Sequence, residues 1–277
     1  TIEINHIRNL LREQRKYVAD ETIQLQEKEI SIQKYSSSCF NIYQACVVGD
    51  LGSVQWYIND GHEDVNKPDE NGTTPLFYSI QKNQLSIVKE LIKAGADVNM
   101  VASLEEGINV TPVHVAVKFN RCECLKILLN HGADANVPNQ FGQTPLHSAV
   151  RRKLRDLVNM LLKNGANVNI TDHDMVTPLH LAASPGSNKD IKEVVKMMID
   201  NGANPLCEDS EGNTVFHEAA ENGSEDVLDV LFEYQSHHTF PSFNVTDVLN
   251  KPRKDGNNCF HLAVKGHVKA VDILYNH

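Results

Sequence analysis

Five histidines recur along the chain, and histidine is the side chain most often used for metal binding and for proton transfer near neutral pH. They are His114, His147, His180, His217 and His261. A zinc site needs three or four ligands that converge on one ion at about 2 Å. Histidines that each belong to a separate packed layer cannot converge, because packed helices lie roughly 8–10 Å apart. The sequence therefore predicts structural histidines and no metal or other cofactor.

The remaining reactive side chains follow no catalytic pattern. The chain has no phosphate-binding glycine loop, no nucleophile elbow and no HExxH motif. His237 and His238 are adjacent, and adjacent histidine side chains rarely converge on one ion. The six cysteines show neither metal-ligand nor disulfide spacing, and Cys122 and Cys124 are expected in a helix core. We expect no enzymatic activity, and a reducing compartment fits these cysteines.

The histidines belong to a repeated unit, of which residues 140–165 hold one complete copy. Gly142 lies in a predicted turn, Thr144 and Pro145 open a short helix, and a second amphipathic helix ends at Gly165. Proline is tolerated in the first helical turn, and glycine suits the left-handed position that closes a helix. Aligned on the threonine, the copies start at Phe40, Thr74, Thr111, Thr144, Thr177, Thr214 and Asn258. A period this regular predicts a solenoid.

These motifs resemble those of the ankyrin-repeat family. The helix-opening motif reads TTPLFYS at 73–79, VTPVHVA at 110–116, QTPLHSA at 143–149, VTPLHLA at 176–182, NTVFHEA at 213–219 and NNCFHLA at 257–263. Matching tails follow, AGADVN at 94–99, HGADAN at 131–136 and NGANVN at 164–169. The resemblance covers residues 39–277. It implies an all-α, right-handed solenoid of helix-turn-helix units in which the motif's threonine and histidine hydrogen-bond locally.

The predicted organisation is a leader helix over residues 1–38 followed by a repeat domain over residues 39–277. The seven repeats lie near residues 40–66, 74–99, 111–136, 144–169, 177–205, 214–235 and 258–277. The leader carries apolar residues at seven-residue spacing, which are Ile4, Leu11, Val18, Leu25 and Ile32. Such a helix either caps the first repeat or pairs with another chain as a coiled coil.

Two further features concern the last repeats. Residues 234–250 form the largest insertion, and insertions in repeat arrays map to surface loops. Near the end, four apolar residues resemble core positions that await a neighbour: Ala270, Val271, Ile273 and Leu274. A terminal repeat is expected to present a polar outer face. We therefore expect a fragment of a longer protein, or an end shielded by an oligomer.

The net charge of −10 is unevenly distributed. Residues 197–250 contain eleven acidic side chains and no lysine or arginine, whereas residues 118–163 carry eight basic against three acidic side chains. A phosphate-binding surface needs a sustained basic face, so nucleic acid is not an expected partner. No apolar run is long enough to span a membrane. The acidic stretch instead favours a protein partner with a basic segment.

The resemblance places partner contacts on the turns before each helix motif, which project as fingers, and on the exposed ends of the first helices. The predicted finger residues are Lys67, Asp69, Glu70, Gln140, Phe141, Asp172, His173, Asp174, Met175, Glu208, Asp209 and Glu211. The predicted helix-end residues are Phe119, Arg151 and Arg152. Phe119 and Phe141 are aromatic where polar residues are expected, so each either anchors a partner or packs on a neighbouring repeat.

The resemblance also implies that Asn66, Asn99 and Asn136 are candidates for hydroxylation by a cytosolic oxygenase. The reducing compartment inferred from the cysteines is the cytoplasm, with the nucleus as the alternative. The function expected is a non-catalytic interaction module that binds a basic segment on its concave and finger surface. One version is similar to the cytosolic inhibitors of Rel-type transcription factors. The alternative is a regulatory ankyrin segment of a larger multidomain protein, such as a channel or an enzyme.

Overall fold

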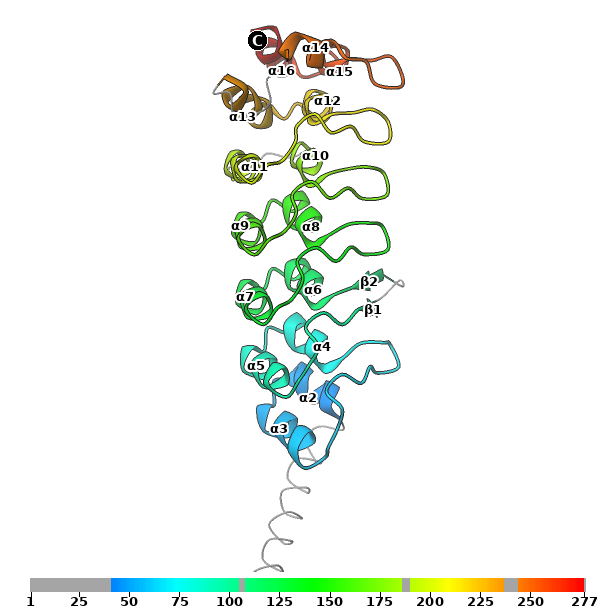
Figure 1. Cartoon of the computed structure of the whole chain (residues 1–277), viewed down its shortest axis with the longest axis vertical. Helices are drawn as coiled ribbons and strands as arrows, with labels where there is room; N and C mark the ends of the chain where they lie inside the picture. The colour runs from blue at the N-terminus through cyan, green and yellow to red at the C-terminus, as the bar shows by residue number, and fades with distance from the viewer. Residues whose placement is uncertain (1–40, 105–107, 186–189, 237–243, 277) are drawn as a thin grey trace, which may run out of the picture.

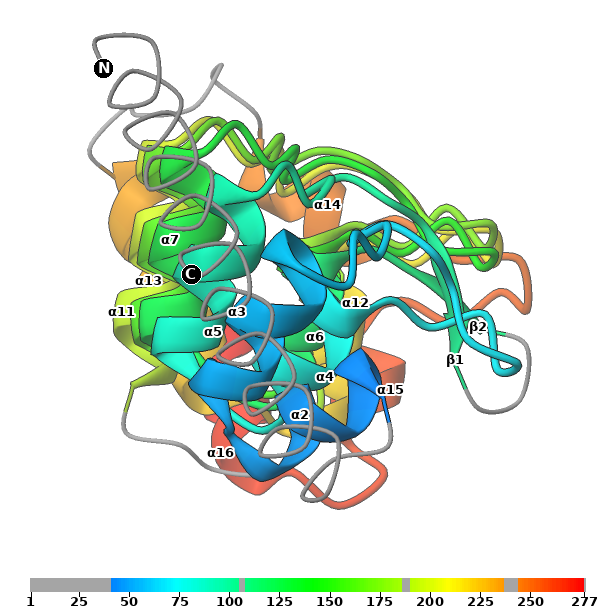
Figure 2. The ribbon, with the colours of Figure 1, turned by 90° about the horizontal axis from the view of Figure 1, so that it is seen from below.

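The computed structural model describes residues 41–104, 108–185, 190–236 and 244–276. The predicted leader helix at 1–38 and Phe40, the predicted start of repeat one, lie outside the described residues. Most of the described chain is helical, and its helices alternate between two columns (Figure 1). Loops join each outer helix to the next inner helix, and they project from the inner column as a ladder of fingers (Figure 2).

The inner column comprises α2 (Ile42–Val48), α4 (Pro75–Gln81), α6 (Pro112–Lys118), α8 (Pro145–Arg151), α10 (Pro178–Ala182), α12 (Val215–Asn222) and α15 (Cys259–Ala263). The outer column comprises α3 (Leu51–Asn59), α5 (Leu85–Lys93), α7 (Cys122–Asn130), α9 (Arg155–Lys163), α11 (Ile191–Asp200), α13 (Glu225–Ser236) and α16 (Val268–Tyr275). Each inner helix and the outer helix that follows it form one layer of the solenoid.

Each inner helix begins at a residue with extended backbone that caps it. At α8 the cap is Thr144, Pro145 occupies the first helical turn, and His147 stands at the third position. The backbone N–H of Thr144 donates to Nδ1 of His147 at 3.1 Å. In return, the Thr144 side chain accepts the backbone N–H of His147. These two bonds form a capping box, which satisfies N–H donors that the start of a helix otherwise leaves unpaired. The same capping box recurs at α6, α10, α12 and α15.

The turn from inner to outer helix requires a left-handed backbone. Repeats two and three supply Asn83 and Asn120, with φ of 60° and 54°, and repeat six supplies Gly223. Asparagine and glycine adopt this conformation readily. Lys153 occupies the same position in repeat four with φ of 56°, which is strained for a lysine. One continuous apolar core runs through the layers, with Leu146, Leu157 and Leu161 fully buried in repeat four. Each layer therefore buries its apolar faces against its neighbours.

Two segments differ in detail from the sequence-based expectation. The connection before α6 forms a short antiparallel hairpin of β1 (Ala102–Leu104) and β2 (Ile108–Val110). The insertion predicted from residue 234 starts later, because α13 runs to Ser236 and the Tyr234 hydroxyl donates to Oδ1 of Asp200 at 2.9 Å. Residues 245–250 form a further short helix, α14 (Val245–Asn250).

No helix among the described residues has the length and apolar character needed to cross a membrane.

Candidate interaction surface

The fingers before α4, α8, α10 and α12 are each held in shape by one carboxylate or amide side chain. In the finger of residues 170–176, Oδ1 of Asp172 accepts hydrogen bonds from the backbone N–H groups of Asp174 and Val176, both at 3.0 Å. Asp69 and Asp209 accept the equivalent bonds in their own fingers. Asp172 is therefore buried and is not the exposed fingertip residue that the sequence predicted. These three aspartates brace the fingers on which the other side chains are displayed.

Successive fingers from repeat four onward are hydrogen-bonded to one another. The carbonyls of Phe141, Asp174 and Glu211 accept backbone N–H groups of the following finger at 3.0, 2.8 and 3.0 Å. A Cβ placed on Gly142 would lie 2.9 Å from the Asp172 backbone, so glycine permits this close approach. The finger containing Gly72 differs, because a Cβ there would meet only the Ser103 carbonyl, at 3.9 Å.

The finger tips expose several predicted partner residues to solvent. They are Lys67, Glu70, Phe141, His173, Asp174, Met175, Glu208 and Glu211. Phe141 and Met175 are each 51% exposed, which leaves two large apolar side chains on neighbouring fingers. Glu208 is the exception among the charged tips, because it forms an ion pair with Lys251. Gln140 is half-buried, and its Oε1 accepts the Asn109 N–H at 2.8 Å.

The predicted helix-end residues serve two different purposes. The guanidinium of Arg152 donates to the carbonyl of Val117 at 2.7 Å and to that of Lys118, so it joins repeat four to repeat three. Arg151 is exposed and reaches Oε1 of Gln143 only at 3.5 Å. Phe119 is half-buried, packs against the core, and also faces solvent space. Its two predicted roles, packing and partner contact, are compatible in this position.

Phe119 lines a cleft of about 350 Å³ between the first fingers and the inner helices. Its inner wall is formed by Phe77 and Tyr78 of α4, and Lys118 stands at its edge with Nζ 5.7 Å from the Phe119 ring centroid. Asn71 and Ser103 close the finger side. The cleft thus combines aromatic walls with amide, hydroxyl and ammonium groups, which suits an apolar side chain with polar neighbours.

The sequence did not single out Asn71, Tyr78 or Ser103 as site residues. Phe77 takes the position of the histidine in the repeat motif, and the hydroxyl of the next residue, Tyr78, donates to Oδ2 of Asp69 at 2.7 Å. This departure from the motif was the available signal. The cleft itself depends on how far two fingers stand apart, which no local pattern encodes.

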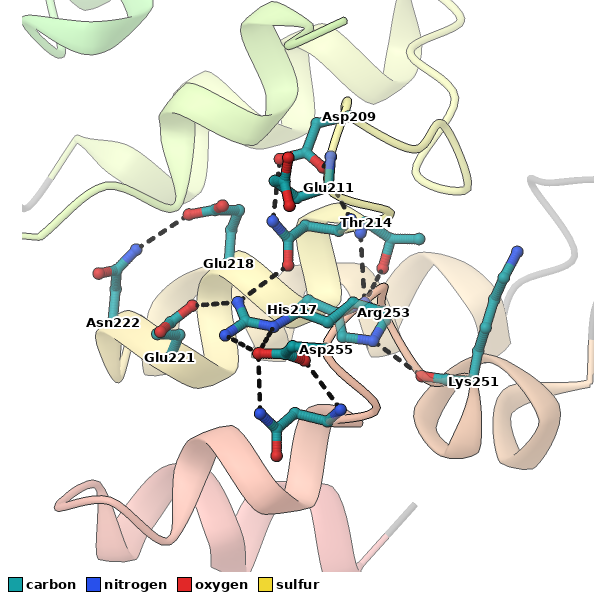
Figure 3. A network of polar contacts seen from close by, with 12 residues as sticks. Asp209, Glu211, Thr214, His217, Glu218, Glu221, Asn222, Lys251, Arg253 and Asp255 are labelled. Carbon is teal, nitrogen blue, oxygen red and sulfur yellow. Dashed lines mark hydrogen bonds and ion pairs between the residues drawn. The ribbon is translucent and has the colours of Figure 1, made fainter. Parts of the chain in front are cut away.

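A cluster of acidic side chains surrounds Arg253 at the other end of the concave face (Figure 3). Arg253 forms ion pairs with Glu221 at 2.7 Å and Asp255 at 2.8 Å. Burial, followed by the charges of Asp209 and Glu221, raises the pKa of Glu218. The carboxylates here outnumber the guanidinium, so negative charge remains.

Many of the other acids in residues 197–250 are already paired with bases from outside that stretch. The ion pairs are Lys192–Asp226, Lys192–Asp229, Lys196–Glu233, Lys251–Glu208, Arg253–Glu221 and Lys269–Glu225. Five acids of the stretch form no ion pair with a base among the described residues, and three of these, Asp209, Glu211 and Glu218, belong to the sixth repeat, so the negative charge on the finger side lies mainly there.

The recurrent histidines connect consecutive repeats. In repeat four, Nδ1 of His147 accepts the Thr144 N–H, so Nε2 carries the proton and donates it to the Val176 carbonyl of the next repeat at 3.1 Å. His114, His180 and His217 make the equivalent bonds. Burial lowers the pKa of all four, that of His114 from 6.5 to about 4. Both ring nitrogens are thus used within the fold.

Four asparagines connect the repeats along a second line. In each asparagine clamp, the side-chain amide donates to a glycine carbonyl one repeat later, and its oxygen accepts a backbone N–H two residues beyond that glycine. The clamps are made by Asn66, Asn99, Asn136 and Asn169. The three predicted hydroxylation sites are therefore clamp residues, and Asn169, the fourth clamp residue, was not among the predicted sites.

The thiols of Cys124 and Cys259 are poorly placed for nucleophilic chemistry. Burial raises the pKa of Cys124 to about 11 and that of Cys259 to about 12, so these sulfurs stay protonated near neutral pH. Cys124 is fully buried, as predicted, and Cys122 is half-buried. Over the described ranges, no group of three or more histidine, cysteine, aspartate or glutamate side chains is arranged to hold a metal ion.

The family model described as ankyrin repeats (3 copies) matches residues 34–102, 101–172, 153–244 and 179–277. The chain belongs to the ankyrin-repeat family. The solved ankyrin-repeat domain of Bcl-3, described as a member of the IkappaB protein family, superposes with a TM-score of 0.68 at 23% identity. That likeness covers 84% of this chain and 97% of the Bcl-3 chain, and at this identity it shows the ankyrin fold alone.

Two curated relatives of this ankyrin chain match only part of it. Palmitoyltransferase AKR1 of Lachancea kluyveri is 33% identical over 100 residues, which is 35% of this chain and 13% of the relative. Transient receptor potential cation channel subfamily A member 1 of Homo sapiens is 30% identical over 105 residues, which is 37% of this chain and 9% of the relative. The matched part thus spans about a tenth of these relatives. Ankyrin repeats form a protein-interaction module, which agrees with a role in interaction or regulation.

Proposed function

We propose that this ankyrin array is a non-catalytic module that binds a basic segment of a protein partner on its concave and finger surface. The observation that carries the proposal is the negative charge around Glu218, where Asp209 and Glu221 lie near and one arginine, Arg253, pairs with both Glu221 and Asp255 (Figure 3). A lysine or arginine from a partner would compensate this charge in a partly desolvated setting, where charge pairing is stronger than in water.

The second half of the proposal concerns apolar anchors. The cleft beside Phe119 and the exposed tips of Phe141 and Met175 lie on the same concave and finger side as the acidic cluster. Binding energy at protein interfaces concentrates in such aromatic and apolar contacts. We expect the partner segment to be extended or helical, with apolar side chains at the cleft and basic ones toward repeat six.

The test compares two charge variants of equal size. Glu211→Lys with Glu218→Gln alters the acidic cluster without touching Asp209, whose side chain braces its finger. Asp156→Lys with Asp97→Gln is the control, because both side chains are exposed away from the cluster. Affinity capture from cell lysate, followed by mass spectrometry, should lose proteins with the first variant only. Binding of a labelled oligolysine peptide should weaken in parallel.

If both variants capture the same proteins with the same salt dependence, the basic-segment proposal is wrong. If Lys118→Ala and Phe141→Ala also leave the captured set unchanged, the concave surface is not the interface. Recovery of a Rel-type transcription factor would select the inhibitor version of this proposal.

The alternative is that the array is a regulatory segment of a larger channel or enzyme. It is favoured by the two relatives, in which the matched segment is about a tenth of the protein. Deletion of the segment from the full-length protein should then alter that protein's activity or assembly, whereas a free adaptor has no such activity to alter.

Three narrower proposals accompany the main one. Hydroxylation of Asn66, Asn99 and Asn136 would add one oxygen atom per site, which peptide mass spectrometry detects after expression in cells. A cytoplasmic and nuclear location is tested by microscopy of the tagged chain. Pairing of two copies through residues 1–38 is tested by sedimentation with and without them, and a monomer in both cases supports a capping role instead.

A further inference from the structure

The outer helices of the later repeats are joined by ion pairs. Lys192 of α11 lies 3.0 Å from Asp229 of α13, and Lys196 lies 2.9 Å from Glu233. One layer earlier, Arg155 of α9 lies 3.9 Å from Glu193 of α11. In each case a base on one outer helix faces an acid on the next, so these layers supply the acidic partners of these bases themselves.

The outer helices α5 and α7 lack such ion pairs among the described residues. The buried residues set the register, because Leu91, Leu128, Met198 and Leu231 are equivalent positions of α5, α7, α11 and α13. By this register, Lys196–Glu233 corresponds to Lys89–Asn130, and Lys192–Asp229 corresponds to Leu85–Lys126. Both acids are missing. Among the described residues, no ion pair joins α5 to α7.

A groove of about 630 Å³ lies between α5 and α7 on the convex side, where the two helices are neighbours in the outer column (Figure 1). Three half-buried apolar side chains, Leu85, Ile92 and Ile127, form its floor. Three exposed lysines, Lys89, Lys93 and Lys126, stand around it. Glu123 also lines the groove, and Glu90 lies 3.9 Å from Lys93, so the rim keeps a positive excess.

We propose that this convex groove is a second docking site, and that its occupant is an acidic amphipathic helix of a protein partner. Charge complementarity selects the occupant, because glutamates or aspartates of the partner helix would pair with Lys89 and Lys126, as Asp229 and Glu233 pair with lysines in the later layers. The apolar floor selects an amphipathic segment, because it offers contacts that a purely ionic partner cannot use. Each wall is a helix of nine residues, about 14 Å long, which matches two to three turns of a ligand helix.

The groove is separate from the concave face described above. The outer helices lie on one side of the solenoid and the fingers on the other (Figure 2). Failure of one site therefore leaves the other intact. A phosphate backbone fits the groove less well, because the basic stripe is short and interrupted by apolar side chains.

The experiment uses a labelled peptide of about 15 residues, long enough to fold on a surface. It carries leucines at i, i+3, i+4 and i+7 with glutamates on both flanks, and a scrambled peptide of equal composition is the control. Binding to the whole chain is followed by fluorescence anisotropy. The test variant is Lys89→Glu with Lys126→Glu, and the matched control is Lys163→Glu with Lys265→Glu, all at exposed positions.

We expect the amphipathic peptide to bind the wild-type chain at least about tenfold more tightly than its scrambled form, and the Lys89/Lys126 reversal to remove at least about tenfold of that affinity. The control variant should change the affinity less than about twofold, since screening weakens distant charges. A peptide with lysines in place of its glutamates should recover binding to the reversed groove.

Equal binding of the amphipathic and scrambled peptides, or equal loss with both variants, overturns the proposal because it shows only general charge attraction. No binding of the peptide overturns it as well. The binding of duplex DNA and of anionic vesicles is measured in the same way. If the Lys89/Lys126 reversal lowers their affinity more than that of the peptide, the proposal is overturned and the groove has a different occupant.

Discussion

The second and third repeats differ from the fourth to seventh in how their layers are joined. In the later repeats, backbone hydrogen bonds link successive fingers and ion pairs link α9, α11 and α13. In the earlier repeats, the first fingers leave a cleft on the concave side, and α5 and α7 leave a basic groove on the convex side. The same repeat unit thus produces later layers whose fingers and outer helices are bonded to one another, and earlier layers that leave polar and apolar side chains exposed in a cleft and a groove.

The difference shows that the fold does not depend on these additional contacts. Histidine bonds and asparagine clamps are present in both halves, together with the continuous core. The finger and ion-pair contacts vary because they lie at the surface, where substitutions cost little. Surface left unpaired in one half is therefore available for partners.

The largest expected effect comes from the finger glycines. Gly142→Ala should destabilise the array by about 2–3 kcal/mol, because the added Cβ meets the next finger's backbone and the backbone is left-handed. Gly72→Ala should cost only about 1 kcal/mol, since it has the strain without the close contact. Urea unfolding of both variants measures the difference. Equal losses would contradict the distinction between joined and open fingers.

The next effect concerns acid. Neutral His114 is favoured in the fold, so the unfolded chain, with a pKa near 6.5, binds more protons than the folded chain, with a pKa of about 4. Stability is therefore retained above pH 6.5 and lost as the pH falls from 6.5 toward 4. His114 alone accounts for about 2 kcal/mol at pH 5. Hydrogen exchange at pH 7 and pH 5 should show α6 opening.

The contrast with the later repeats sharpens this prediction. Burial lowers the pKa of His147, His180 and His217, and a nearby acid partly offsets this effect. The acid is Asp172 for His147 and Asp209 for the other two. Among the described residues, no acid acts in this way on His114, whose pKa burial lowers to about 4. Acid should therefore loosen the third repeat before the fifth. In a His114→Gln variant, the pH dependence of unfolding should become shallower. A uniform response of all layers would contradict the comparison.

A smaller effect is expected from the outer helices. Lys192→Glu should destabilise the array by up to about 1 kcal/mol, because its partners Asp226 and Asp229 become repulsive neighbours. Lys126→Glu should instead leave stability unchanged or raise it, since it places an acid near Lys89. Thermal unfolding at low ionic strength distinguishes the two. If Lys126→Glu destabilised the array as much as Lys192→Glu, the proposed difference between the paired helices α11 and α13 and the unpaired helices α5 and α7 would be wrong.

The smallest effect lies in the interhelical turn. Lys153 occupies the left-handed position that Asn83 and Asn120 occupy in the preceding repeats. Lys153→Asn should raise stability by about 0.5 kcal/mol, because relief of strain is partly offset by loss of the hydrogen bond from Nζ to the Ser184 carbonyl. The change in urea midpoint measures it, with Lys163→Asn as the control. A lower midpoint would show that the hydrogen bond outweighs the strain.

The sequence predicted the repeat and the helix pairs, because these are fixed by local spacing, and the family resemblance implied the local hydrogen bond between threonine and histidine. It also placed Cys124 in the core. The bond from each of the four buried histidines to the next repeat was not predicted. It did not predict that Asp172 would be buried, because the finger's own N–H groups claim that carboxylate. Nor did it predict the pairing of the acidic stretch, because the bases of those pairs lie outside that stretch, as Lys192 lies 37 residues from Asp229.

The asparagine clamp has a mechanical consequence. The last clamp joins Asn169 to Gly202, and Leu206 stands where the next asparagine would follow in the repeat. Beyond it, no clamp among the described residues adds to the finger and histidine hydrogen bonds, and exposed ion pairs stand between the outer helices, where dissolved ions screen them. Stretched from its ends in concentrated salt, the molecule should yield first in its sixth and seventh layers, while the clamped layers extend later as one elastic unit.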